Sequence, residues 1–191
     1  PELLRELCKI EDVKWIRLLY CYPERVTDEL IETIASEEKI LNYIDLPLQH
    51  VSENMLKMMN RTGNAKTLRE LINKLRAKIP NIVLRTTFIV GFPSEMEENF
   101  EELCNFANEM QFDRMGCFTY SPEENTKAAL FENQISEEIK LKRQEILMEQ
   151  QNLILERKCN SLPGKNVLVL IDGFDETKGW LFGRSYMDLP D

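Results

Sequence analysis

Four short runs of apolar and β-branched residues alternate along the chain with segments whose apolar positions recur at helical spacing. The runs cover residues 15–22, 41–49, 81–92 and 112–120. Strands that alternate with helices in this way are typical of a parallel sheet, in which each helix crosses over to the next strand. Residues 1–134 are therefore predicted to fold as repeated β-α units of an α/β protein.

Hydroxyl residues followed three positions later by glutamate indicate where two of the helices begin. Thr67 and Glu70 precede one apolar face, and Ser94 and Glu97 precede another. A shorter helix is expected after Thr27. Each hydroxyl would accept a hydrogen bond from an unpaired amide of the first helical turn.

The pattern changes after residue 134. One long amphipathic helix is predicted over residues 135–161, with Glu137 near its start and Arg157 near its end, as the helix dipole favours. Two strand-like pieces follow, "NVLVLI" and "WLFGRS", separated by a turn-rich segment. Residues 162–191 are predicted to begin a small all-β module.

Polar residues interrupt the predicted strands at regular positions. With a period of two, Arg85, Thr87 and Gly91 share one face of the third run, and Asp45 and Gln49 share one face of the second. Buried charge is unfavourable unless it is paired. The sequence therefore predicts a polar small-molecule site inside the sheet, at the carboxyl ends of the strands where such sheets bind ligands. A salt-bridge network of Arg17, Asp45 and Arg85 without a ligand is the alternative.

Several residues at the predicted strand ends indicate how the backbone turns or pairs there. Gly91 allows a sharp turn or a close approach to a ligand, and the helix expected after Ser94 would direct amide hydrogens towards the site. Pro47 lacks an amide hydrogen, so strand pairing is expected to bulge or end there. His50, the only histidine, is more often a structural hydrogen-bonding residue than a proton donor in such a place.

The net charge of the chain indicates which kinds of macromolecule it is suited to bind. Aspartate and glutamate number 33 against 24 lysines and arginines, which gives a net charge of -9. This balance disfavours a surface for phosphate backbones and suits a basic partner, although acidity also serves solubility alone.

The five cysteines are scattered, and no pair has the spacing of a zinc or iron–sulfur site, so no metal ligands are assigned in this chain. No apolar run is long enough to cross a membrane, and a cytoplasmic location is expected. The first residue is proline, and the chain is interpreted as an internal piece of a longer protein.

Several motifs in order resemble the methylthiotransferase branch of the radical S-adenosylmethionine (SAM) enzymes. They are "YIDLPLQHVSENMLKMMNR", "RTTFIVGFPSEMEENFEEL", "FDRMGCFTYSPEENTKAA" and "GRSYMDLPD". Within that branch, "DLPLQH" and "FDRMGCFTYSPEE" are more similar to the enzymes that modify ribosomal protein S12 than to those that modify transfer RNA.

This resemblance implies an architecture and an activity. Residues 1–134 would be the later β-α units of a radical SAM barrel of the TIM type, 135–161 a linker helix, and 162–191 the beginning of a TRAM domain. The implied reaction attaches a methylthio group to the β-carbon of an aspartate of S12. It uses SAM, an electron donor and two [4Fe–4S] clusters, whose ligands would lie outside this chain.

The resemblance also implies roles for the polar strand residues. Arg85 would bind the SAM carboxylate, Asp45, Gln49 and Thr87 its amino group or ribose, and Gly91 would let the adenine approach the backbone. No catalytic side chain is assigned. The alternatives are a transfer-RNA methylthiotransferase and a non-catalytic binding fragment, and an unpaired sheet edge would favour self-association.

Overall fold

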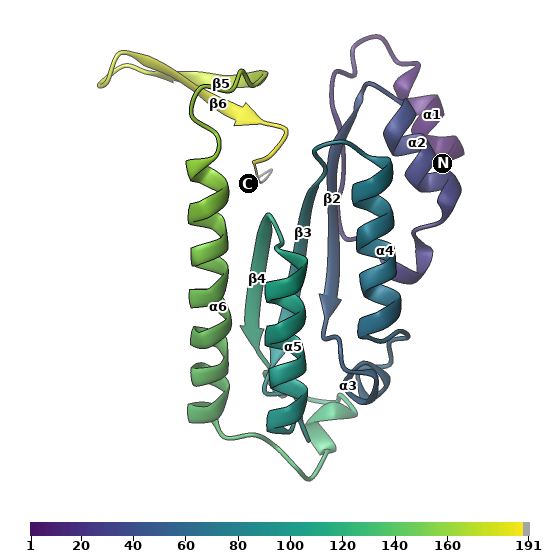
Figure 1. The fold of residues 1–191 in the computed structure, drawn as a ribbon, viewed down its shortest axis with the longest axis vertical. Coiled ribbons are helices and arrows are strands. Elements are labelled where there is room, and N and C mark those ends of the chain that lie inside the picture. The colour runs from purple at the N-terminus through teal and green to yellow at the C-terminus, as the bar shows by residue number, and fades with distance from the viewer. Residues whose placement is uncertain (189–191) are drawn as a thin grey trace.

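The computed structural model describes residues 1–188 and is an α/β fold built on one parallel sheet (Figure 1). The four strands lie in the order of the sequence, each parallel to its neighbour. They are β1 (Ile16–Leu18), β2 (Ile40–Gln49), β3 (Val83–Val90) and β4 (Arg114–Thr119). All four predicted strands are confirmed, with β1 shorter than expected.

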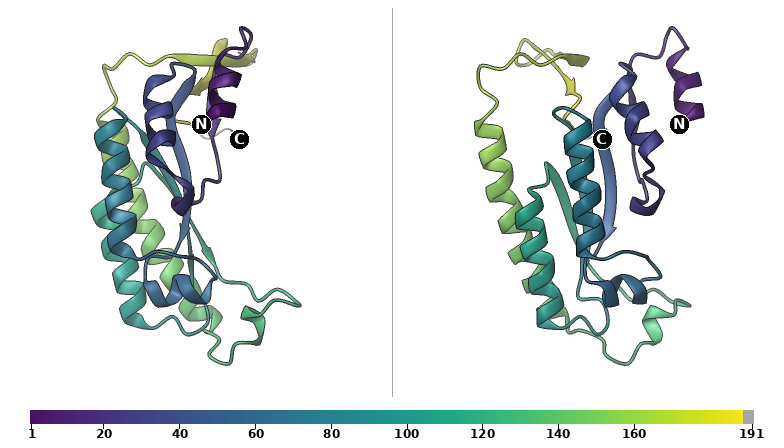
Figure 2. Two further views of the ribbon diagram at one scale, coloured as in Figure 1. Left: turned by 90° about the vertical axis from the view of Figure 1, so that its right-hand side faces the viewer. Right: turned by 45° about the vertical axis from the view of Figure 1, so that its right-hand side comes forward.

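Helices connect the strands and gather on one side of the sheet. Two views at right angles agree that α4, α5 and α6 cover the same face (Figure 2). No helix within residues 1–188 is long and apolar enough to cross a membrane. The helices are α1 (Glu2–Cys8), α2 (Asp28–Ser36), α3 (Glu53–Met58), α4 (Ala65–Lys78), α5 (Glu97–Met110) and α6 (Glu137–Asn160), with short 3-10 turns at Pro23–Arg25 and Ala128–Leu130.

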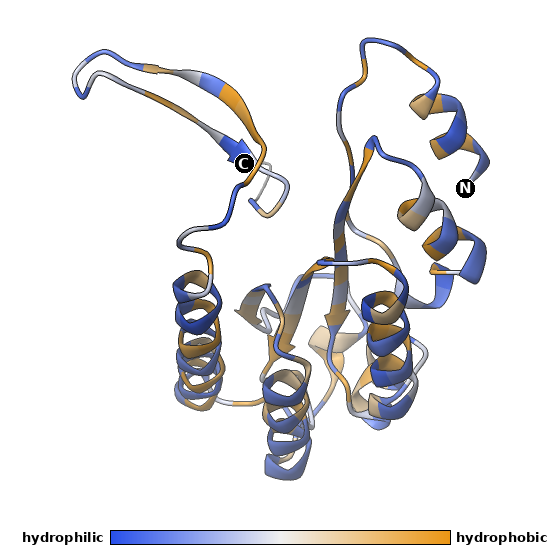
Figure 3. Ribbon diagram, turned by 45° about the horizontal axis from the view of Figure 1, so that its top comes forward, coloured by the Kyte–Doolittle hydropathy of each residue, from blue (hydrophilic) through white to orange (hydrophobic). Residues whose placement is uncertain are grey.

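The hydrophobic core lies between these helices and the sheet. Every second residue of the central strands points into it, as the period of a strand requires. Colouring by hydropathy shows apolar residues concentrated in the strands, while α4, α5 and α6 carry both polar and apolar segments (Figure 3). The core residues of the sheet are Ile44, Leu46, Leu48, Leu84, Phe88, Val90, Met115 and Cys117.

The predicted N-terminal cap is correct for α2 and wrong for α4. Thr27 caps α2 by accepting the Leu30 amide hydrogen at 3.2 Å. The prediction that Thr67 caps α4 is wrong, because the helix begins two residues earlier, at Ala65. Asn64 is the cap: its side chain accepts from the Thr67 amide at 3.0 Å, and the Thr67 hydroxyl accepts from the Asn64 amide at 3.1 Å. Asparagine caps helices as well as threonine does.

The predicted cap of α5 is also wrong. Ser94 lies in a left-handed turn with a φ of 66°, and the helix begins only at Glu97. The turn closes with a hydrogen bond from the Glu95 amide to the Phe92 carbonyl at 3.0 Å. The Met96 amide donates to the Asn99 side chain at 3.0 Å, so Asn99 satisfies the first turn from within the helix.

The long helix α6 confirms the prediction for residues 135–161, with its acidic first turn and basic last turn. An antiparallel hairpin of β5 (Val169–Asp175) and β6 (Trp180–Ser185) follows it. In Figure 1 this hairpin lies at the amino-terminal ends of the parallel strands, far from their carboxyl ends. The last part of the predicted all-β module, residues 189–191, lies outside the described residues.

Candidate functional site

The sheet face opposite the helices is the candidate site. Along β3, burial alternates: Thr86, Phe88 and Val90 are buried among the helices, whereas Arg85 and Thr87 on the other face are partly exposed. This alternation is the one that the sequence predicts. We call the face that carries Arg85 and Thr87 the open face.

Asp45 and Arg85 meet on the open face. They are directly opposite in the parallel register of β2 and β3, and the Asp45 Oδ2 atom accepts a hydrogen bond from Arg85 Nη1 at 3.1 Å. Oδ2 also accepts from the Tyr20 amide at 3.2 Å. The Asp45 side chain is fully buried, yet its Oδ1 atom has no hydrogen-bond partner within the described residues. The pair therefore contains an unused carboxylate oxygen, shielded from solvent in this structure, beside a partly exposed guanidinium.

Arg17 does not join this pair, so the alternative of one salt-bridge network of Arg17, Asp45 and Arg85 is wrong. The guanidinium of Arg17 instead donates to the backbone carbonyls of Ser185 and Asp188 and stacks over the Tyr43 ring at 4.7 Å. The end of β6 and the residues after it provide these acceptors, and Tyr186 and Met187 pack against Tyr43 of β2 and Val83 of β3. No local pattern could reveal these contacts. Burial lowers the pKa of Arg17.

Pro47 interrupts the pairing of β2 with β3, as predicted. The register shifts between Leu46 and Gln49. The Thr86 hydroxyl bridges the gap, because it donates to the Leu46 carbonyl at 2.8 Å and accepts from the Leu48 amide at 3.4 Å. No local sequence pattern marks Thr86 as a site residue, since its role depends on the neighbouring strand.

Gln49 ends β2 in a left-handed conformation with a φ of 67°. Its Oε1 atom is buried without a hydrogen-bond partner in the described part of the chain. It lines a small pocket of about 160 Å³ together with Tyr20, Tyr22 and Arg61. Like Asp45 Oδ1, this oxygen can accept a hydrogen bond from a ligand.

Gly91 adopts a φ of 71°, which confirms the sharp turn predicted after β3. It does not lie among the residues of the open face. A Cβ atom at this position would collide with the Lys140 side chain of α6, so the close neighbour of Gly91 is a helix. The helix expected after Ser94 begins only at Glu97, and the turn before it uses its own amides, because Gly91 donates to Glu95 and Ser94 to the Asn133 carbonyl.

Thr87 lies between Arg85 and the carboxyl end of β3, opposite Gly116 of β4. Arg85 and Asp45 lie deeper, towards the middle of the sheet, whereas Gln49 lies at the end of β2. The polar residues thus form a band from mid-sheet to the carboxyl edge, rather than one cluster at the strand ends.

His50 is a structural hydrogen-bonding residue, as expected. It is fully buried, its Nδ1 atom accepts from the amides of Val51 and Ser52 at 2.9 and 3.0 Å, and its Nε2 atom lies 3.2 Å from Glu95 Oε1. No local sequence pattern indicates that Glu95, 45 positions away, is its partner.

Comparison with known proteins agrees with this fold. A family model described as the Radical SAM superfamily matches residues 1–107 of the 191. The chain therefore belongs to the radical SAM superfamily.

Curated relatives bear the name "Ribosomal protein uS12 methylthiotransferase RimO". Those of Caldanaerobacter subterraneus subsp. tengcongensis and Thermoanaerobacter sp. are 56% and 51% identical over the whole of this chain. The relative from Bdellovibrio bacteriovorus is 47% identical. These matches confirm the resemblance to the methylthiotransferase branch. The chain spans 43%, 43% and 42% of the three relatives, less than half of their length.

Two solved structures have a similar fold. One is coproporphyrinogen III oxidase (HemN) from Escherichia coli, with a TM-score of 0.51 and 16% identity over 84% of this chain and 35% of that one. The other is the radical SAM methyltransferase TsrM from Kitasatospora setae, with a TM-score of 0.50 and 17% identity over 62% and 24%. At these identities the likeness concerns the fold alone.

The side chains present fit SAM but not an iron–sulfur cluster. Asp45 Oδ1 and Gln49 Oε1, which have no hydrogen-bond partner among the described residues, are acceptors suited to a ligand with ammonium and hydroxyl donors. Within residues 1–188 no group of three or more histidine, cysteine or acidic residues could hold a metal. Burial raises the pKa of Cys104 to about 11 and that of Cys117 to about 12, so both are neutral thiols at neutral pH.

Proposed function

We propose that this chain is part of a radical SAM methylthiotransferase that acts on ribosomal protein S12, and that the open face binds SAM. The observation that carries the SAM site is the Asp45–Arg85 pair, in which one carboxylate oxygen has no hydrogen-bond partner in residues 1–188. The names and identities of the relatives support the reaction class.

The pair complements the amino acid part of SAM. That part carries an ammonium and a carboxylate on one carbon, so it needs an anion and a cation side by side. Asp45 Oδ1 accepts from the ammonium, and the guanidinium hydrogens of Arg85 that Asp45 does not use bind the carboxylate. Gln49 and Thr87 lie nearer the carboxyl edge and bind the ribose. The role expected for Gly91 beside the adenine is not part of this proposal, because Gly91 faces Lys140 of α6.

The bound cofactors supply the radical chemistry that attaches the methylthio group to the β-carbon of an S12 aspartate. The residues of this chain orient SAM and exclude water from it. We assign residues 1–134 to the radical SAM barrel, 135–161 to a linker helix and 162–191 to the beginning of a TRAM domain. The ligands of both clusters belong to the rest of a longer cytoplasmic protein, which also receives electrons from a donor.

The net charge of -9 supports the basic S12 protein over transfer RNA as the substrate. The test is to incubate the full-length protein, with reconstituted clusters, SAM and a reductant, with an S12 peptide or with unmodified transfer RNA. Mass spectrometry should find the methylthio group on the aspartate of the peptide. Modification of the RNA alone would assign the chain to the other branch of the family.

Absence of product on both substrates, while SAM still binds, would support a binding fragment without this activity. Self-association of the separate chain through the edge of β1, the first strand of the sheet, is a further part of the proposal. Sedimentation of the chain at increasing concentration tests it, and a monomer throughout would contradict it.

A further inference from the structure

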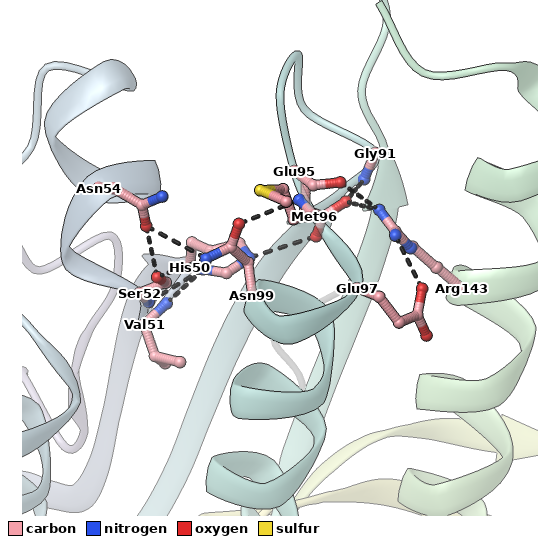
Figure 4. A network of polar contacts seen from close by, with 10 residues as sticks. All are labelled: His50, Val51, Ser52, Asn54, Gly91, Glu95, Met96, Glu97, Asn99 and Arg143. Carbon is pink, nitrogen blue, oxygen red and sulfur yellow. Dashed lines mark hydrogen bonds and ion pairs between the residues drawn. The ribbon is translucent and has the colours of Figure 1, made fainter.

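Three buried side chains outside the proposed SAM site form one polar network (Figure 4). His50, Glu95 and Arg143 are exposed by only 0%, 2% and 7%. They come from the end of β2, from the turn before α5 and from α6, so the network joins segments far apart in the sequence. The proposed binding of SAM uses none of them.

His50 fixes one end of the network. Because its Nδ1 atom accepts two backbone amide hydrogens, of Val51 and Ser52, the ring proton must lie on Nε2. Nε2 then donates to Glu95 Oε1 at 3.2 Å. The turn that follows β2 is thereby tied to Glu95.

Glu95 is the centre of the network. Its Oε2 atom accepts from the Gly91 amide and from Arg143 Nη1, the latter at 2.9 Å. Arg143 Nη1 also donates to the Glu95 carbonyl at 2.9 Å, and Nη2 donates to Glu97 at 3.0 Å. One buried carboxylate thus holds the turns after β2 and β3 and connects both to α6.

Each of these two turns contains a residue in the strained left-handed conformation, which contacts with the surrounding structure must stabilise. Gln49 and Ser94 have φ values of 67° and 66°, which cost about 1–2 kcal/mol for a residue with a side chain. Such conformations persist where the surrounding structure enforces them. Gln49 immediately precedes His50, so the contact of His50 with Glu95 determines where the unpaired Oε1 atom of Gln49 lies.

We infer that His50, Glu95 and Arg143 are positioning residues for the SAM site. Through their contacts, helix α6 fixes Gln49 in the position from which its side chain accepts a hydrogen bond from the ligand. This inference rests on the proposed function, because it assumes that the open face binds SAM. Stability alone does not require charges here, since buried ion pairs are often replaceable by apolar residues without loss. A need for fixed geometry explains a fully paired carboxylate at this place.

The test compares two variants of α6 in the full-length protein. Arg143→Met removes the ion pair with Glu95. Gln151→Met, the matched control, removes a buried hydrogen bond to the Phe112 carbonyl of 3.1 Å, far from the turns. SAM affinity is measured by calorimetry, and thermal unfolding of each variant is followed in parallel.

We expect Arg143→Met to weaken SAM binding about tenfold, as loss of supporting contacts does at other sites. Arg143→Lys should recover part of the affinity, because it keeps the charge. Gln151→Met should lower the unfolding temperature and leave the affinity unchanged. Hydrogen exchange of the Val51 and Ser52 amides should accelerate in Arg143→Met and not in Gln151→Met.

Unchanged SAM affinity in a folded Arg143→Met variant would overturn the inference while leaving the SAM site intact. Equal losses of affinity in Arg143→Met and Gln151→Met would also overturn it, since the effect would then follow stability. If the wild-type protein does not bind SAM, the proposed function is wrong, and this inference is then wrong as well. Should Arg143→Met not fold, Glu95→Gln provides the same comparison, because it keeps the acceptor for Gly91 and removes the charge.

Discussion

Asp45 and Arg85 lie opposite each other on neighbouring strands, and their side chains form a salt bridge of 3.1 Å on the open face of the sheet. Only one oxygen of the buried carboxylate takes part within the described residues. A pair held purely for stability would leave no buried acceptor unused, because an unpaired polar atom costs about 1–3 kcal/mol. This incomplete pairing is the physical basis for placing a ligand here.

Arg85→Ala in the full-length protein should weaken SAM binding. A hydrogen bond to a charged group contributes about 1.5–3 kcal/mol, which corresponds to a loss of about ten- to a hundredfold in affinity. Calorimetry measures the dissociation constant. Arg114→Ala is the control, because its side chain is on the same face, opposite Arg85, and both side chains are 27% exposed. Equal affinities of the Arg85→Ala protein and the wild type would exclude the proposed site.

Gly91→Ala should destabilise the fold more than Gly179→Ala. Both glycines have a φ of 71°, so each substitution imposes the left-handed strain of about 1–2 kcal/mol. Only at Gly91 would the new Cβ also collide with Lys140, whose ammonium donates to the Tyr120 carbonyl at 2.8 Å. Denaturant unfolding gives both free energies. Losses of the same size would mean that Lys140 moves aside freely.

Leu147→Ala should lower the free energy of unfolding by about 2–5 kcal/mol, because the side chain is fully buried between α6 and the sheet and leaves a cavity. Leu153, on the same helix, is 62% exposed, so Leu153→Ala should change stability by less than about 0.5 kcal/mol. Urea denaturation of both variants provides the comparison. A small effect at Leu147 would show that α6 is not packed on β4 in solution.

The partly buried thiol of Cys104 and the buried thiol of Cys117 should react slowly and lose their contribution to stability at high pH. Burial raises the pKa of Cys104 from 9.0 to about 11 and that of Cys117 from 9.0 to about 12. The folded state therefore favours the neutral thiols, a contribution fully present below pH 9 and lost as the pH rises through the two folded-state values. Cys159, by contrast, is exposed to solvent.

Iodoacetamide labelling at pH 8, followed by mass spectrometry, should modify Cys159 first and leave Cys104 and Cys117 unmodified while the protein is folded. The Cys159→Ser variant is the control for background labelling. Rapid modification of Cys117 in folded protein would contradict the burial of β4 beneath α6.

Local patterning along the chain was enough to predict the β-α order, the long helix α6 and the alternation of Arg85 and Thr87 with buried neighbours. These features follow from backbone periodicity and side-chain polarity, which are properties of a segment by itself. The bulge at Pro47 belongs to the same group, because a missing amide hydrogen disrupts a ladder whatever its partner.

Tertiary structure alone decided which polar groups meet. Arg17 binds carbonyls that follow β6, Gly91 packs on Lys140, and Glu95 joins His50 to Arg143. Each of these contacts joins residues more than 40 positions apart, so its formation depends on how the strands and α6 are packed together. Charge and polarity identify the candidates, but the register of neighbouring elements determines their partners.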